Sequence, residues 1–141
     1  MGKWIETYKG VVYPWNCDHL GHMNVQHYVA MFDQAGYHLM HAMGFSHDYS
    51  VAEGHGPMDV QHTIKYVNEQ KAGSLVTVNS GIVDVRPKTY TMFHRMTNTE
   101  TGVVAATSEI VLINVDLAVR KAAEILPDVR AVLEAHLVER E

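Results

Sequence analysis

Hydrophobic positions recur with two different periods along the chain, and the change of period separates the expected elements. Residues 4–13 are rich in aromatic and β-branched side chains and end at Pro14, which predicts an opening strand. From residue 24 to about residue 43, apolar side chains recur every three or four positions, which predicts a long amphipathic helix that Gly44 closes. The apolar positions on one face of this helix are Tyr28, Met31, Phe32, Ala35, Leu39 and Met43.

The second half of the chain has the pattern of strands joined by short turns. A loop with glycine and proline at residues 54–57 precedes four such segments, at residues 58–67, 74–85, 88–97 and 102–115. Because the connections are short, we expect these strands to be antiparallel neighbours. Pro127 suits the first turn of a closing helix. The order predicts an α+β fold, with a long central helix wrapped by an antiparallel sheet of about five strands and a short C-terminal helix.

Two features of this pattern predict close contacts outside the main core. The final strand is apolar on both faces over residues 110–115, whereas one helix covers only one face of a sheet. We therefore expect a second copy of the chain to cover the other face, in a homodimer or homotetramer. Gly36 lies in mid-helix, where glycine costs up to about 1 kcal/mol relative to alanine, and it predicts the close approach of another backbone.

Length and composition indicate an ordinary globular protein. The 141 residues are 47% hydrophobic and 19% charged, and we expect them to form one domain, residues 1–141. Cys17 is the single cysteine, which excludes an internal disulfide and fits a reducing compartment. Glu6 and Lys9 interrupt any apolar signal, and no stretch reaches the roughly 20 apolar residues of a membrane span, so we expect a cytoplasmic protein. The net charge of −5 argues against nucleic acid as a partner.

One short loop before the long helix collects groups that could cleave an acyl bond. Asp18 lies six residues before Asn24, and Gly21 between them allows the loop to fold back. Asn24 is a favoured N-cap residue, so the backbone N–H of Val25 falls in the first helical turn, where such groups lack internal partners. They can polarise a carbonyl while a carboxylate attacks it or activates water. The alternative is that Asp18 only caps a turn.

Other reactive or aromatic side chains have simpler interpretations. We expect Cys17 to act as a small buried hydrophobic residue. The ten histidines include no His-Glu-x-x-His motif and there is no cysteine pair, so no metal site is expected. Trp4, Tyr13 and Trp15 are expected in the core or in a dimer contact, with contact to an aromatic or cationic acyl group as the alternative.

The loop motif carries a family resemblance. Asp18-x-x-Gly21-His22-x-Asn24-x-x-x-Tyr28 lies between a strand and a long helix, and Ile64-Lys65-Tyr66 leads on to Gly73. This arrangement resembles the hotdog-fold acyl-CoA thioesterases, in the branch that includes 4-hydroxybenzoyl-CoA thioesterase, and the resemblance covers nearly the whole chain. It implies a hotdog fold and the hydrolysis of a small or medium acyl-CoA to the free acid and coenzyme A. Coenzyme A is then part of the substrate, and no separate cofactor is implied.

The resemblance also implies roles for individual residues. The Asp18 carboxylate matches the catalytic group, either as general base or as nucleophile, and the Val25 N–H matches the group that polarises the thioester. Asn16 replaces the first acid of the family's Asp-Cys-Asp segment, which changes the charge around Asp18. His22 matches a histidine proposed to act in related thioesterases, but Leu20 replaces the asparagine that accompanies it in plant enzymes. For His22 we therefore favour a hydrogen bond that orders the loop over direct catalysis.

Further candidates concern substrate binding. Arg86 and Lys88 flank a turn that is similar to the phosphate-holding turn of related enzymes, and a solvated turn is the alternative. Asn24 is chiefly a cap that could also contact substrate, and Tyr28 is chiefly a packing residue whose hydroxyl could orient a substrate group. We expect the site at a subunit interface. The alternative functions are a non-catalytic acyl-CoA-binding protein and a hotdog dehydratase.

Overall fold

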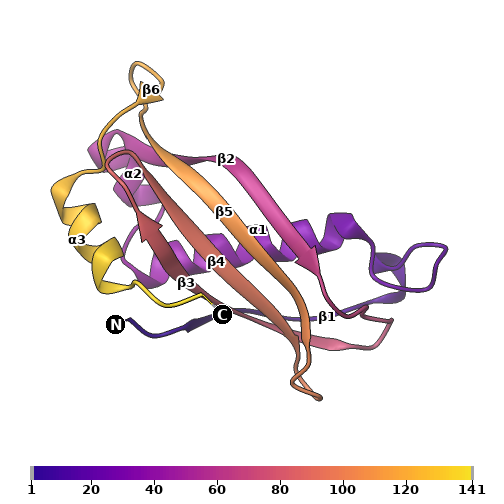
Figure 1. Cartoon of the computed structure of the whole chain (residues 1–141). Helices are drawn as coiled ribbons and strands as arrows, with labels where there is room; N and C mark the ends of the chain where they lie inside the picture. The colour runs from indigo at the N-terminus through magenta and orange to yellow at the C-terminus, as the bar shows by residue number, and fades with distance from the viewer. Residues whose placement is uncertain (1, 141) are drawn as a thin grey trace.

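The computed structural model describes residues 2–140, and its elements follow the predicted order with three short additions (Figure 1). In chain order they are β1 (Ile5–Val11), the 3₁₀ turn η1 (Pro14–Asn16), α1 (Val25–Ala42), α2 (His47–Glu53), β2 (His55–Tyr66), β3 (Leu75–Val85), β4 (Thr89–Asn98), β5 (Val104–Asp116), β6 (Lys121–Ala122) and α3 (Pro127–Ala135). The short elements η1, α2 and β6 were not predicted. In α2 seven residues make only two turns, too few for a helical period to emerge from the sequence.

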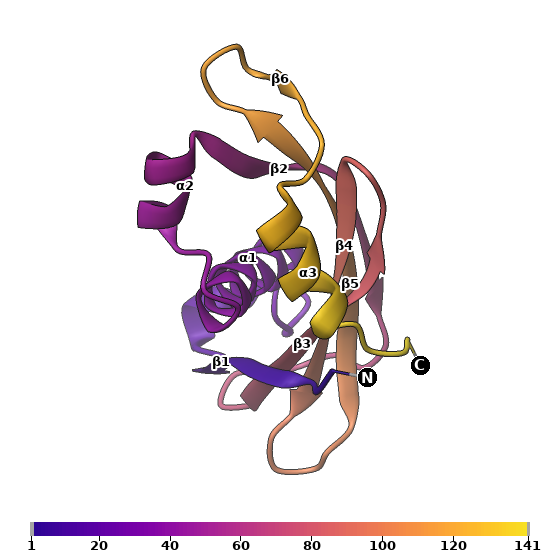
Figure 2. The same cartoon turned by 90° about the vertical axis from the view of Figure 1, so that its left-hand side faces the viewer.

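The six strands form one antiparallel sheet that curls around α1 (Figure 2). Its order is β1-β3-β4-β5-β2, and β6 pairs with the end of β5. The predicted α+β architecture is confirmed, but the expectation that all successive strands are neighbours is wrong for β2. That strand pairs with β5 along its whole length, at the edge opposite to β1.

The connection between β2 and β3 explains this difference. It passes the N-terminal end of α1 and is held there by backbone hydrogen bonds rather than forming a tight turn. Met23 N donates to Gln70 O at 2.8 Å, and Gly73 N donates to Val12 O at 2.7 Å. The chain therefore crosses from one edge of the curled sheet toward the other before β3 begins.

The core lies between α1 and the concave face of the sheet. The helix buries Tyr28, Met31, Phe32, Ala35 and Leu39, all of which belong to the predicted apolar face. Asn24 caps the start of the helix, as expected from its residue type. Gly44, with φ of 93°, follows its end in the left-handed conformation that favours glycine. The helix is therefore confirmed in both position and orientation.

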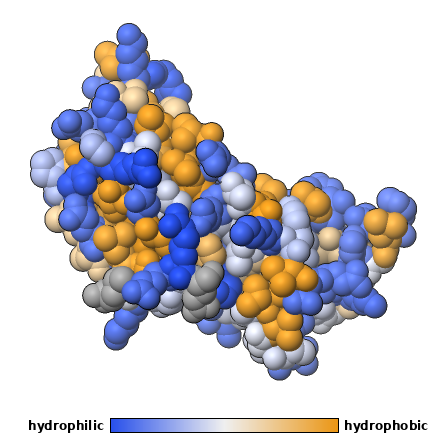
Figure 3. All heavy atoms as spheres, viewed as in Figure 1, coloured by the Kyte–Doolittle hydropathy of each residue, from blue (hydrophilic) through white to orange (hydrophobic). Residues whose placement is uncertain are grey.

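The convex face of the sheet is partly covered by the chain's own ends. Trp4 lies edge-on to the buried Phe93, with 5.8 Å between ring centroids. Gly81 lets the C-terminal segment approach, because a Cβ at this position would lie 2.4 Å from Val138 Cγ2. Figure 3, seen from this side, shows hydrophobic residues interleaved with hydrophilic ones. The chain's own ends therefore cover part of this face, and a second copy over the remainder stays a prediction.

A row of polar side chains crosses the buried face of the sheet. The hydroxyls of Thr7 and Ser80 are 2.7 Å apart, and Ser80 Oγ lies 2.5 Å from His94 Nδ1. His94 is directly opposite Ser108 on the next strand, and Ser108 Oγ lies 2.6 Å from His62 Nε2. His94 is fully buried, its Nε2 has no hydrogen-bond partner among the described residues, and burial lowers its pKa to about 3. The ring is therefore neutral in the folded protein.

Among residues 2–140, no helix has the length and apolar character needed to cross a membrane.

Candidate active site

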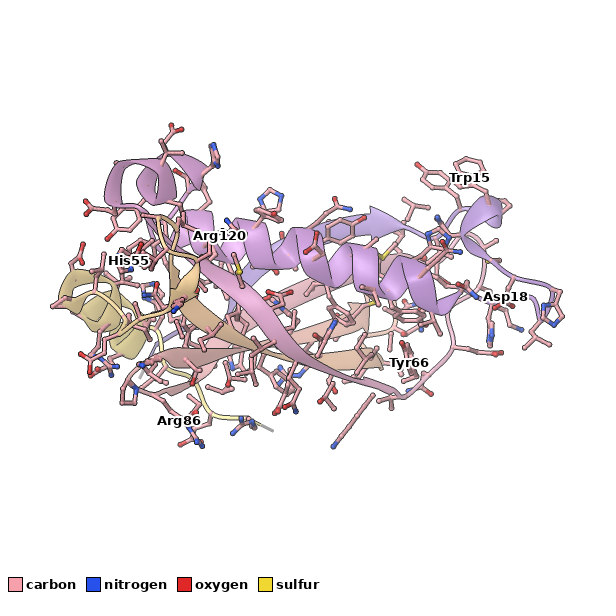
Figure 4. The ribbon with its side chains drawn as sticks, turned by 90° about the horizontal axis from the view of Figure 1, so that it is seen from above. Trp15, Asp18, His55, Tyr66, Arg86 and Arg120 are labelled. Atoms are coloured by element: carbon pink, nitrogen blue, oxygen red, sulfur yellow. The ribbon has the colours of Figure 1, made fainter. Side chains whose placement is uncertain are left out.

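The loop between η1 and α1 folds back as its glycine predicts. Asp18 N donates to His22 O, and Gly21 N donates to Asp18 O, each at 3.0 Å, while Gly21 adopts φ of 81°. An isolated antiparallel β-bridge between the backbones of Cys17 and Met23 closes the base of the loop. Asp18 consequently lies beside the start of α1, at the same end of the molecule as Tyr66 (Figure 4).

Both oxygens of the Asp18 carboxylate are oriented by hydrogen bonds. Oδ1 accepts from Leu20 N at 2.9 Å, and Oδ2 accepts from Asn24 Nδ2 at 3.0 Å. The bond from Asn24 lowers the pKa of Asp18 most, followed by the bond from Leu20, while burial opposes them and the charge of His22 adds a smaller lowering. The turn-capping contact considered from the sequence is therefore present. It coexists with a link to the helix start, and the carboxylate is ionised at neutral pH.

Asn24 joins this carboxylate to the helix terminus. Its Oδ1 accepts from Gln26 N at 3.1 Å, which satisfies one orphan donor of the first turn, while its Nδ2 holds Asp18. The Val25 N–H has no acceptor among the described residues, and Val25 is 54% exposed. A donor without a partner thus lies at the positive end of the helix dipole, directly after the asparagine that holds the ionised carboxylate.

His22 lies between two carboxylates. Its Nδ1 is 3.0 Å from Glu69 Oε2, and its Nε2 is 3.7 Å from Asp18 Oδ1. Glu69 fixes the ring from one side, as expected for a histidine that orders the loop. Glu69 cannot be recognised from the sequence, because it is 47 residues from His22 in the chain and belongs to no motif.

The β2–β3 connection that carries Glu69 is itself anchored. Gln70 is only 3% exposed, and its Oε1 accepts from Asn98 Nδ2 at 3.0 Å. Tyr28 is also buried, and its ring lies edge-on to Tyr66 with 5.1 Å between centroids. Tyr28 therefore packs in the core, as its helical position predicts, and sits beneath the loop rather than inside it.

The aromatic residues around η1 lie at the surface of the chain. Tyr13 and Trp15 stack in parallel, with 4.6 Å between ring centroids, and Trp15 is 73% exposed. Trp15 is therefore not a core residue, and its expected place in a dimer contact stays a prediction. Asn16 accepts from Tyr13 N at 2.8 Å and lies 3.3 Å from His27 Nδ1. An amide serves both contacts without adding a second negative charge near Asp18.

The proposed phosphate-binding turn lies far from Asp18 within one chain. Arg86 lies at the opposite end of the molecule from Asp18, toward His55 (Figure 4). It is exposed, and its Nε lies 2.9 Å from Asp84 Oδ2. Lys88 occupies the same turn, where its carbonyl accepts from Asn114 N at 2.8 Å. The structure therefore does not bring Arg86 and Lys88 to the loop of their own chain.

A cavity of about 420 Å³ lies between the second half of α1, α2 and the first half of β2. Apolar residues from α1 and from the sheet form its floor, among them Phe32, Met92 and Leu112. Gly36 also lines the cavity, and the nearest atom to a Cβ built there would be Met92 Sδ at 3.8 Å. The expected close approach of another backbone at Gly36 is therefore wrong. The missing side chain instead leaves room within the cavity.

Comparisons with known proteins agree on the family. The profile of the thioesterase-like superfamily matches residues 12–133. A betainyl-CoA thioesterase of Pseudomonas aeruginosa is 28% identical over 140 residues, covering 96% of this chain and 88% of that protein. An L-carnitine dehydrogenase/betainyl-CoA thioesterase of Agrobacterium fabrum is 30% identical over 117 residues, covering 83% of this chain, which spans only 24% of that longer protein.

The fold is also found among solved structures. A Staphylococcus aureus protein in complex with CoA superposes with a TM-score of 0.87 at 16% identity, covering 100% of this chain and 90% of that one. At this level of identity the likeness concerns the fold alone, whereas the profile match covers most of the chain. The chain therefore belongs to the thioesterase-like superfamily, has a hotdog-like fold, and is an acyl-CoA thioester hydrolase.

Proposed function

We propose that Asp18 is the catalytic carboxylate and that the Val25 N–H polarises the thioester carbonyl of a small or medium acyl-CoA. The observation that carries this proposal is the coupling of the two groups through Asn24. One side chain caps the helix that presents Val25 and also holds Asp18 Oδ2 at 3.0 Å. The ionised carboxylate and the free donor therefore keep a fixed relation to each other, as electrostatic catalysis requires.

The chemistry needs no metal. The carbonyl oxygen becomes negative as the thioester carbon is attacked, and the N–H at the start of α1 stabilises that charge. Asp18 either takes a proton from the attacking water or attacks the carbon itself before water releases the acid. In both routes the C–S bond breaks, and the departing coenzyme A sulfur takes up a proton. His22, held by Glu69, keeps the loop in place.

The catalytic loop and the cavity of one chain are too far apart to serve the same acyl group. Val25 starts α1, and the cavity extends along the helix from Phe32 to His41, roughly 10 to 24 Å away. A short acyl chain attached to a thioester at Val25 cannot reach most of that length. We therefore propose a homodimer in which Asp18 of one copy faces the cavity of the other.

The open edge of β2 provides the surface for such a dimer. β2 pairs only with β5 among the described strands, so its other edge is free. Figure 4 shows β2 running beside α1, with Tyr66 near Asp18 and His55 at the opposite end. Antiparallel pairing of β2 with a second copy brings that copy's Asp18 end to the His55 end of this chain. The cavity and Arg86 both lie at that end.

Exposed apolar side chains follow the same surface. Val25 and Val29 are exposed and lie one turn apart on α1, and Tyr37 is exposed two turns farther along the helix. Val60 and Tyr66 are exposed on β2. Large exposed apolar side chains on two elements beside an open sheet edge are typical of an interface between copies. Figure 2 shows that the sheet leaves one side of α1 uncovered.

The relatives make betainyl-CoA the first substrate to assay, because both are named for that activity. The test is release of free thiol from betainyl-CoA by the wild type and by Asp18→Asn, with Asp48→Asn, an exposed carboxylate on α2, as the matched control. We expect Asp18→Asn to lose at least a hundredfold in kcat while the fold is kept. Retention of more than a tenth of the wild-type rate would refute the role of Asp18.

The two alternative functions raised by the sequence predict other results in this assay. A non-catalytic acyl-CoA-binding protein would bind the thioester with no release of thiol by the wild type. A dehydratase would instead change the absorbance of an unsaturated acyl-CoA. The family assignment favours hydrolysis over both.

A further inference from the structure

The cavity has an unusual balance of charge for a pocket with an apolar floor. Two carboxylates, Asp33 from α1 and Asp59 from β2, are among its lining residues. None of the described residues that line it is lysine or arginine. Three aromatic rings, those of Phe32, Tyr37 and Phe45, complete the wall. Aromatic faces and carboxylates both attract cations.

A β-bulge aims Asp59 into this space. In a regular strand, residues 59 and 62 would point to opposite faces of the sheet. The register with β5 shifts between Asp59 and Gln61, so Val60 is an extra residue, and Asp59 and His62 then pair with Leu112 and Ile110. Those two partners are both buried under α1. The bulge therefore turns Asp59 toward the helix and toward Asp33.

Neither carboxylate is neutralised within its own chain. Neither Asp33 nor Asp59 forms a salt bridge or a side-chain hydrogen bond among residues 2–140. The pKa of Asp59 is raised by burial first and by the negative charge of Asp33 second, while His62 opposes the shift. Both carboxylates line the cavity but are exposed to solvent in the single chain, and each senses the charge of the other. A positively charged occupant of the cavity would relieve their repulsion.

We propose that Asp33 and Asp59 form a cation-recognition site that selects acyl groups carrying a quaternary ammonium. This inference rests on the proposed function, because it places the acyl end of the thioester in the cavity. A trimethylammonium group cannot donate hydrogen bonds, so it is recognised by charge and by contact with aromatic faces rather than by fixed donors. The cavity supplies both, and no lysine or arginine is among its described lining residues.

Gly36 completes the site by leaving space for the methyl groups. It lies between Asp33 and Tyr37 on the cavity wall of α1. A methyl at this position would be 3.8 Å from Met92 Sδ, so it would fit without a clash but would project into the cavity. The volume beside the two carboxylates therefore depends on a residue that is otherwise unfavourable in mid-helix.

The test compares two thioesters that differ only in charge. Betainyl-CoA carries a trimethylammonium group, and 3,3-dimethylbutyryl-CoA replaces its nitrogen with carbon, which keeps the shape. Thiol release from both is measured for the wild type, Asp59→Asn and Asp33→Asn, with Asp48→Asn on α2 as the control. We expect the wild type to favour the cationic substrate in kcat/KM. Each cavity variant should lower that preference by about tenfold, mainly through KM, whereas the control keeps it.

The outcomes separate this inference from the proposed function. Hydrolysis of both thioesters with a preference that neither cavity variant changes would overturn the cation site and leave the catalytic proposal standing. If the wild type releases no thiol, the catalytic proposal fails, and the binding affinities of the two thioesters, measured by calorimetry, still test the site. The cation site then requires tighter binding of betainyl-CoA, weakened in Asp59→Asn.

Measuring the oligomeric state of the variants tests one other explanation for a loss of activity. The carboxylates could pair with a lysine of the second copy, such as its Lys65, rather than with substrate. In that case Asp33→Asn and Asp59→Asn would weaken the dimer and lower the rates with both thioesters equally. Size-exclusion chromatography with light scattering detects this result, which would overturn the inference.

Discussion

Replacing His94 with asparagine is expected to make the protein less sensitive to acid. His94 is fully buried at the centre of the polar row, and burial holds its pKa at about 3, compared with an ordinary value of 6.5. Between these two pH values the unfolded chain binds a proton at this residue and the folded protein does not. The free energy of unfolding therefore falls as the pH falls below 6.5, and His94 contributes to that loss.

The magnitude follows from the difference in protonation. A histidine that stays neutral in the fold and ionises freely in the unfolded chain lowers the free energy of unfolding by about 1.4 kcal/mol for each pH unit below its ordinary pKa. From pH 7.5 to pH 5, His94 should thus account for about 2 kcal/mol of lost stability. Asparagine can still bond to Ser80 but does not titrate, so the variant lacks this contribution.

Urea denaturation at several pH values measures the effect. The loss of stability between pH 7.5 and pH 5 should be smaller in His94→Asn than in the wild type by about 2 kcal/mol, whatever the absolute stability of the variant. The other histidines are common to both proteins and cancel in this comparison. Parallel curves would refute the reasoning, as would an NMR titration that shows the His94 ring becoming protonated near pH 6.

Two further predictions address the catalytic loop and the convex face of the sheet. Glu69→Ala should free the ring of His22 and lower kcat by about threefold to tenfold, with little change in melting temperature because Glu69 is exposed. Glu69→Gln keeps a hydrogen-bond acceptor and should lose less of the wild-type kcat. Equal kcat values in the wild type and both variants would contradict the positioning role. Gly81→Ala should destabilise the fold by about 1–3 kcal/mol in thermal or urea denaturation, because its new Cβ meets Val138 Cγ2. Adding Val138→Ala should recover part of that loss. Strictly additive effects of the two substitutions on the free energy of unfolding would show that this contact is not responsible.

The sequence predicted those parts of the fold that depend on local periodicity. The spacing of apolar residues located α1 to within a residue of each end, and Asn24 and Gly44 fulfil the capping roles typical of their residue types. The place of β2 in the sheet was not predictable in this way, because it depends on where the 67–74 connection passes the helix. Hydrophobic periodicity carries no information about which edge of a sheet a strand joins.

The candidate site shows the same division between local and distant contacts. The link between Asp18 and Asn24 follows from a short loop with a central glycine, and the structure contains it. Glu69 and Asp59 could not be found from spacing, since each approaches the site from a different segment of the chain. Asp59 also depends on a bulge that no turn residue marks in the sequence. Gly36 stands out in the sequence because it lies in mid-helix, but its contacts show that it leaves space in the cavity and that no other backbone packs against it.

The bulge in β2 limits how this protein can change during evolution. If Val60 joined the ladder as an ordinary strand residue, either Asp59 or the segment from His62 to Tyr66 would turn to the convex side. In the second case Ile64 would leave the core, and Tyr66 would leave its contact with Tyr28. Deletion of Val60 itself would keep Asp59 and His62 on the helix side, because their partners Leu112 and Ile110 are already two residues apart. Descendants of this chain are therefore expected to tolerate a change of length at the bulge itself, whereas an insertion or deletion elsewhere in the strand would damage packing and acyl selection together.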